Sequence, residues 1–273
     1  HDIEDPTFDA TAVASNPRAQ VRPIHRPPRM PADRNPHCAW TVIIDEAHPE
    51  VHGIPNLAIV EASRAAGLVL DPIDETDEGR ADYAGPLVSD LDFAEFSHSA
   101  LVRIADEVCV QMHLLNLGFL LAVRTRAESD EQHVEIATKQ LVGIAGIAAE
   151  RIHRALGTDA LRTLELHPLL NPAAYVDATV EDGTLAVAWG PAHEDGAWIS
   201  LVGPDSVRPL QAIVRAVDPT LDVEVLGSET GWTATLVDRV ESADEFGEVA
   251  VTRFSSGAGF EFEARRSIPI TPV

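Results

Sequence analysis

Four potential metal ligands lie within eight residues of one another, directly after a short apolar run. They are Asp45, His48, Glu50 and His52. Imidazole and carboxylate groups are ligands that Zn²⁺, Mn²⁺ and Fe²⁺ use in proteins. A divalent ion held there would act as a Lewis acid, and Glu46 or Glu50 would serve as the base. The alternative is a solvated acidic loop, because Pro49, Gly53 and Pro55 allow at most one helical turn.

A second set of ligands depends on two predicted helices folding back on each other. A turn near residue 128 sets Glu107 opposite Glu150 and His153. One Glu facing a Glu-x-x-His motif is half of the ligand set of di-iron four-helix bundles, and a dimer would supply the other half. The alternative is a set of ordinary ion pairs with nearby arginines. These are Arg103, Arg151 and Arg154.

Other motifs lack a partner that their chemistry requires. The string from Thr41 to His48 resembles the Walker B strand of DEAH-type helicases, whose mechanism also needs a glycine-rich phosphate loop that ends in Lys. Lys139 is the only lysine, and no such loop precedes it. Helicase activity is therefore excluded.

Cys109 lies in an apolar predicted helix, where a structural thiol is the common case.

The charge balance excludes whole classes of partner. The chain has 44 acidic residues against 20 Lys and Arg, a net charge of −24 over 273 residues. Such a field repels nucleic acids and anionic membranes, so we expect neither as a partner. Coding bias in a GC-rich genome and a salt-loving host both explain this composition.

The distribution of cysteine and apolar residues predicts a soluble cytoplasmic protein. Cys38 and Cys109 form no C-x-x-C motif, and the expected state of both is a free buried thiol. The first thirty residues contain no apolar stretch typical of a signal peptide. The longest apolar run, Leu114 to Val123, is about half the length of a membrane span.

The clearest structural signal is a pair of long antiparallel helices. Apolar residues recur at steps of three and four over 99–126 and again over 130–156. Ser129 and Gln132 match a capping box, and Gly157 ends the second helix. The connection of about three residues predicts adjacent antiparallel helices. Gly143 and Gly146 would allow another element to approach closely.

The first forty residues predict an extended arm. Residues 1–38 are rich in Pro and Arg, which disfavours helices and central strands, and we expect the arm to bind a second copy of the chain. A small α/β unit follows, with a buried strand at 39–45, a helix at 56–66 and a return strand at 68–70.

Beyond residue 170 the apolar pattern has a period of two, which predicts a mostly antiparallel sheet. Expected strands are 175–180, 185–189, 197–202, 221–226, 232–237, 248–254 and 259–265. A helix over 206–217 with Asp205 as its N-cap interrupts them, and Asp182-Gly183 predicts a hairpin turn. The fold class is α+β, with predicted domains at 1–38, 39–170 and 171–273.

Two functions of different classes follow. The first is a cytoplasmic enzyme that binds a small-molecule ligand, assisted by Zn, Mn or Fe in the 45–52 segment. The second is a non-catalytic assembly subunit that forms a homo-oligomer through its arm and helical hairpin. Convergence of the candidate ligands in one pocket would favour the first function, and an apolar interaction surface would favour the second.

Overall fold

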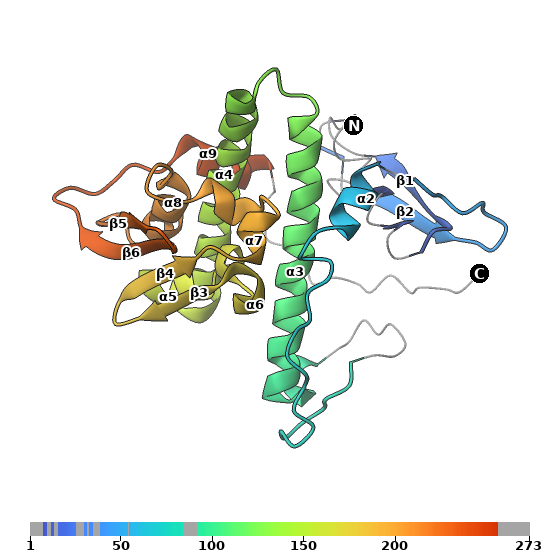
Figure 1. Cartoon of the computed structure of the whole chain (residues 1–273), viewed down its shortest axis with the longest axis horizontal. Coiled ribbons are helices and arrows are strands. Elements are labelled where there is room, and N and C mark those ends of the chain that lie inside the picture. Colours follow the sequence, from blue (N-terminus) through green and yellow to red (C-terminus); the bar gives the residue numbers. More distant parts are fainter. Residues whose placement is uncertain are drawn as a thin grey trace.

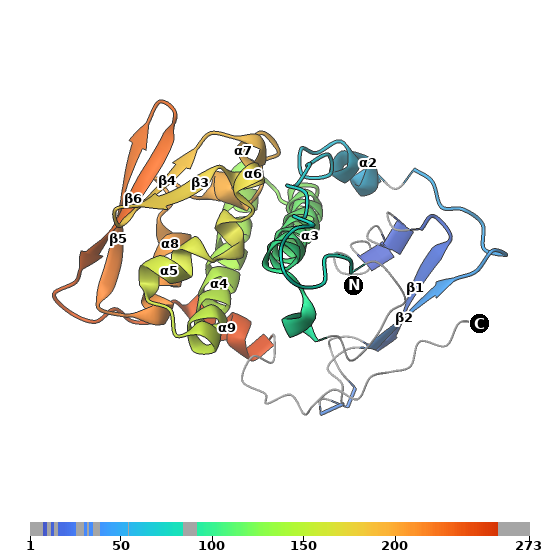
Figure 2. The ribbon, with the colours of Figure 1, turned by 90° about the horizontal axis from the view of Figure 1, so that it is seen from below.

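The structure is a computed structural model that describes residues 8–9, 12–13, 16–25, 30–31, 33–34, 39–53, 55–83 and 92–255. It is an α+β protein in which the long helix α3 (His98–Arg124) stands between two parts. A small part on one side contains β1 (Ala19–His25), β2 (Ala39–Ile44) and α2 (Pro55–Glu61). The main body on the other side contains the remaining helices and a four-stranded sheet (Figures 1 and 2).

The small part differs from the predicted arm and βαβ-like unit. Strand β1 lies within the predicted arm and pairs antiparallel with β2, so residues 19–25 are extended as predicted but belong to a two-stranded sheet that was not predicted. Strand β2 exists as expected but is not buried, since Val42 is 61% exposed. Helix α2 ends at Glu61, and residues 68–70 form no strand.

The predicted helical hairpin is confirmed. Helix α3 and helix α4 (Asp130–Leu156) are antiparallel and joined by a short turn (Figure 1). The Ser129 hydroxyl accepts a hydrogen bond from the amide of Gln132 at 3.2 Å. The Gln132 side chain reaches back as predicted, but it accepts from the amide of Glu128 at 2.6 Å, one residue before the N-cap Ser129. Gly157 ends α4 in the left-handed conformation.

The main sheet is antiparallel, with strand order β3-β4-β6-β5. Its strands are β3 (Ala178–Glu181), β4 (Thr184–Ala188), β5 (Leu221–Ser228) and β6 (Gly231–Asp238). Asp182 and Gly183 form the predicted two-residue turn, both with positive φ. The helices of this part are α5 (Ala160–Glu165), α6 (Ala173–Val176), α7 (Pro191–Glu194), α8 (Arg208–Val217) and α9 (Gly247–Ser255), with 3₁₀ turns η2 (Pro168–Leu170) and η3 (Trp198–Leu201). A further 3₁₀ turn, η1 (Phe93–Glu95), directly precedes α3.

Several predicted strands in this region are wrong. Residues 197–202 contain η3, and residues 248–254 lie in helix α9. The predicted strand at 175–180 begins late, because Tyr175 and Val176 end α6. Helix α8 begins at Arg208 without a side-chain cap, so Asp205 is not its N-cap. The predicted strand 259–265 lies outside the described residues.

The main core is formed by α4, α8 and one face of the sheet. Tyr175 and Trp232 are its largest fully buried side chains, whereas α3 contributes Leu117. Helix α9 crosses α4 at the two glycines that were predicted to allow close approach. A β-carbon at Gly146 would lie 2.6 Å from Cγ2 of Val249, and one at Gly143 would lie 2.8 Å from the carbonyl oxygen of Glu248. Glycine therefore permits this helix crossing.

One carboxylate joins the turn after α2 to the main body. Asp195 accepts hydrogen bonds from the Tyr175 hydroxyl at 2.7 Å and from the backbone amides of Arg64 and Ala65 at 2.8 and 3.0 Å. The Arg64 guanidinium also pairs with Glu194 at 2.8 Å. These contacts fix the chain that leads from α2 toward α3.

Helix α3 also has the length and composition of a membrane span, with 22% of its most apolar 18-residue window buried inside the protein. A core helix of a soluble protein passes the same test, so this is weak evidence for a membrane.

Candidate functional site

The predicted metal ligands at 45–52 lie in an exposed loop that is organised by Arg18. The Arg18 guanidinium pairs with the Glu50 carboxylate at 2.8 Å and donates to the carbonyl oxygens of His48 at 2.6 Å and Glu46 at 3.4 Å. Nδ1 of His48 lies 3.3 Å from the Arg18 carbonyl oxygen. A cation supplied by the chain therefore already occupies the centre of this loop.

The remaining candidates in the loop have local partners. Asp45 accepts from the amide of Ala47 at 2.8 Å and so closes a turn. Nε2 of His52 lies 3.2 Å from the second carboxylate oxygen of Glu50. Glu46 contributes its backbone carbonyl to Arg18 and its side chain is exposed. Among the residues that the structure describes, no three His, Cys, Asp or Glu side chains form a group able to hold a metal ion.

The second predicted ligand set is divided among different partners. Glu107 pairs with Arg103 at 2.9 Å, as in the ion-pair alternative. Glu150 pairs instead with Arg253 of α9, a partner that the sequence did not indicate. Nδ1 of His153 lies 2.6 Å from the carbonyl oxygen of Thr158, just beyond the end of α4. The structure therefore does not bring Glu107 into a shared ligand set with Glu150 and His153.

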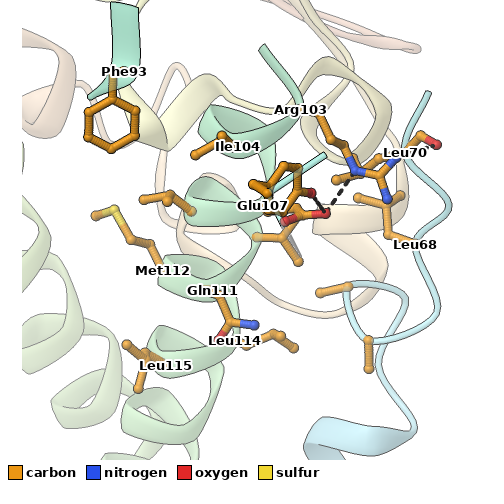
Figure 3. Close-up of a pocket in the computed structure, with 15 residues that line it drawn as sticks. Leu68, Leu70, Phe93, Arg103, Ile104, Glu107, Gln111, Met112, Leu114 and Leu115 are labelled. Atoms are coloured by element: carbon orange, nitrogen blue, oxygen red, sulfur yellow. Dashed lines mark hydrogen bonds and ion pairs between the residues drawn. The ribbon is translucent and has the colours of Figure 1, made fainter. Parts of the chain in front are cut away.

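One concave surface among the described residues is a groove along α3, which we call the α3 groove. It has a volume of about 810 Å³. Its walls are formed by one face of α3, the segment after α2 and Phe93 (Figure 3). Most of its lining is apolar, and Val108 and Phe93 are each 55% exposed. The principal apolar residues are Leu68, Leu70, Ile104, Val108, Met112 and Leu115.

A small polar cluster lies in the α3 groove. Oε1 of Glu107 accepts from the Tyr83 hydroxyl at 2.7 Å and from Nε of Arg103 at 2.9 Å. Nη1 of Arg103 also donates to the carbonyl oxygen of Asp71 at 2.8 Å. Figure 3 shows Arg103 and Glu107 pointing toward each other between Leu70 and Ile104. Burial and then the hydrogen bond to Glu107 raise the pKa of Tyr83.

Carboxylates crowd one border of the groove. Burial and then the nearby charge of Asp71 raise the pKa of Asp106, and the positive charge of Arg103 offsets only part of that effect. Burial, together with Asp106, also raises the pKa of Cys109 to about 11. The Cys109 thiolate is thus disfavoured at neutral pH, which argues against a nucleophilic role for this residue.

The opposite face of α3 is buried against the main body. His113 is fully buried, its Nε2 donates to the carbonyl oxygen of Asn171 at 2.9 Å, and its ring packs edge-on to Tyr175 at 4.9 Å. Burial lowers the pKa of His113. These contacts favour a structural role for His113 over that of a base.

The sequence indicated only part of this site. Glu107 was a candidate residue, but for a metal. The pairing of Arg103 with Glu107 was the predicted alternative to a metal site, but the roles of Tyr83 and of the segment 65–83 were missed. Its high density of carboxylates next to the apolar residues 68–70 was the available signal.

Comparison of the chain with protein-family models, with curated proteins and with solved structures finds no match.

Proposed function

We propose that this chain is a non-catalytic binding subunit that holds a partner polypeptide in the α3 groove. The observation that carries this proposal is the half-exposed apolar floor of that groove on a helix whose other face is buried. Protein surfaces that expose apolar side chains in one continuous patch commonly serve as interaction sites. Of the two predicted functions, the non-catalytic assembly subunit is closer to this proposal, although it was expected to bind a second copy of the chain through its arm and helical hairpin.

The polar groups of the groove are suited to binding. Glu107, Arg103 and Tyr83 satisfy one another through hydrogen bonds, so they provide a fixed polar edge beside the apolar floor. Such an arrangement of an apolar centre and a polar border is typical of helix-binding grooves. The metal-assisted enzyme at 45–52 stays a prediction that elemental analysis of the purified protein tests.

A designed amphipathic helix with glutamine on its polar face is a suitable probe, because it carries no charge that could bind elsewhere. We expect fluorescence anisotropy to show saturable binding to the wild-type chain. The double variant Val108→Gln, Leu115→Gln should lower the affinity at least about tenfold, since each change removes apolar contact area from the floor.

A matched control is available on the same helix. Val102 is 46% exposed but does not line the groove, so Val102→Gln should leave probe binding unchanged. Equal loss of binding in the control and the double variant, or a wild-type chain that does not bind the probe, would contradict the proposed function.

A further inference from the structure

We propose that the segment held in the α3 groove is a basic amphipathic helix of about three turns, with apolar side chains on one face and Lys or Arg on the other. This inference rests on the proposed function, and it names the chemistry of the partner.

The length follows from the groove floor. Ile104, Val108 and Met112 follow one another at steps of four residues, and Leu115 continues the stripe three residues later. At 1.5 Å per residue this stripe is about 16 Å long, which matches about three turns of a helix lying alongside. A partner helix would place apolar residues at the same spacing of three and four.

The positive charge of the partner helix is inferred from the acidic segment that borders the groove. Leu70 and Tyr83 both line the groove, and the residues between them include six carboxylates and one arginine. The carboxylates are Asp71, Asp74, Glu75, Asp77, Glu78 and Asp82. Arg80 is engaged, because its Nε donates to the Asp82 carbonyl at 2.6 Å and its guanidinium lies over the Phe96 ring at 5.0 Å.

Apart from Asp82, these carboxylates have no Lys or Arg ion-pair partner in the part of the chain that the structure describes. Within the described residues, no Arg or Lys forms an ion pair with Asp71, Asp74, Glu75, Asp77 or Glu78. Asp71 and Asp106 lie near enough to repel each other, and Arg103 already pairs with Glu107. A Lys or Arg brought by the partner would relieve that repulsion.

The same charges disfavour other occupants. A second copy of the chain would bring its own share of a net charge of −24 to this acidic border, and an anionic membrane would be repelled in the same way. A basic helix would make two kinds of favourable contact. Its apolar face would cover the apolar floor of the groove, and its Lys or Arg side chains would lie near the acidic border.

The test compares three peptides with one apolar face and with Lys, Gln or Glu on the polar face. At about 50 mM NaCl we expect the Lys peptide to bind at least about tenfold more tightly than the Gln peptide, and the Glu peptide to bind most weakly. Raising NaCl to about 500 mM should remove most of the advantage of the Lys peptide.

Two double variants with the same net charge locate the effect. Asp71→Asn with Asp106→Asn should weaken binding of the Lys peptide about fivefold or more and leave the Gln peptide unchanged. Asp205→Asn with Asp244→Asn changes two exposed carboxylates that, unlike Asp71 and Asp106, are not next to a groove-lining residue in the sequence, and it should alter the binding of neither peptide. Circular dichroism checks that both variants are folded.

Each outcome is decisive. Equal affinity for the Lys and Gln peptides, equal effects of the two double variants, or preference for the Glu peptide would overturn the basic helix while leaving the proposed function intact. Binding of none of the peptides would overturn both. A dimer in sedimentation that excludes the peptides would show that a second copy fills the groove, which also overturns the inference.

Discussion

At the residue scale, buried titratable groups decide how the protein responds to acid. His167 is 3% exposed and has partners for both ring nitrogens. Nε2 lies 3.1 Å from the Ala145 carbonyl oxygen, and Nδ1 accepts from the amide of Leu169 at 3.1 Å. That arrangement holds the ring neutral, and burial lowers its pKa to about 4.

We therefore expect stability to fall as the pH drops below about 6.5, the pKa of an unfolded histidine. Between that value and about 4 the unfolded chain binds a proton that folded His167 does not. At pH 4 this difference lowers the free energy of unfolding by roughly 3 kcal/mol. Burial also lowers the pKa of His113, which reduces stability in acid in the same way.

Urea unfolding of His167→Asn at several pH values measures this contribution. The variant should be less stable than the wild type at pH 7, because the buried imidazole ring is lost. It should lose less stability between pH 6.5 and 4, because Asn keeps the acceptor for Leu169 and does not titrate. The control His98→Asn replaces an exposed histidine and should keep the wild-type pH dependence. Parallel pH profiles for His167→Asn and wild type would contradict the assignment.

At the element scale, the crossing of α4 and α9 depends on two glycines. A methyl group at Gly143 would meet the Thr252 side chain and also the Glu248 backbone, which cannot move without shifting α9. Ion pairs of Arg253 with Glu150 and Glu245 hold α9 beside this contact. Close backbone approach therefore positions the last described helix.

Gly143→Ala should lower the free energy of unfolding by about 1–3 kcal/mol, because the added methyl group overpacks the crossing. Gly118→Ala is the matched control, since Gly118 is also inside a long helix but has no atom within 4 Å of its added β-carbon. That change should be neutral or stabilise by up to about 1 kcal/mol. Urea denaturation compares the two, and a destabilising effect of Gly118→Ala as large as that of Gly143→Ala would argue against a packing cause.

The long helices could be predicted from sequence, whereas several short elements could not. The stripes over 99–126 and 130–156 extend over many turns and are flanked by capping residues, so local signals agree with the tertiary structure. Residues 248–254 include Val249, Val251, Thr252 and Phe254, which are β-branched and aromatic residues that favour a strand, but docking on the glycines of α4 requires a helix. Tertiary packing overrides a pattern this short.

Prediction of the candidate site from sequence has the same limit, because contacts between distant segments are not visible in local patterns. The residues at 45–52 have ligand chemistry and close spacing, but Arg18, about thirty residues away in sequence, occupies the centre of their loop. The groove combines α3 with residues 65–83 and Phe93, and local periodicity does not report such pairings. Glu107 could be identified as a functional candidate, but its partner Tyr83 could not.

At the scale of the whole molecule, the net charge of −24 works against compaction. Raising NaCl from about 20 mM to about 500 mM should increase the melting temperature by several degrees, because salt screens repulsion between exposed carboxylates. Scanning calorimetry measures the shift, and KCl should act like NaCl. A melting temperature that falls with salt would show that surface ion pairs outweigh the repulsion.

The three donors that meet at Asp195 are not equally replaceable. Two are backbone amides, at Arg64 and Ala65, which almost any substitution at those positions retains, whereas the third is the hydroxyl of Tyr175. Phenylalanine at 175 would leave the carboxylate with two donors, but a side chain at 195 that cannot accept would strand both amides. Evolutionary drift should therefore be freer at position 175 than at 195. In a chain that lost the acid first, phenylalanine at 175 would relieve only the stranded hydroxyl and would leave both amides without their acceptor.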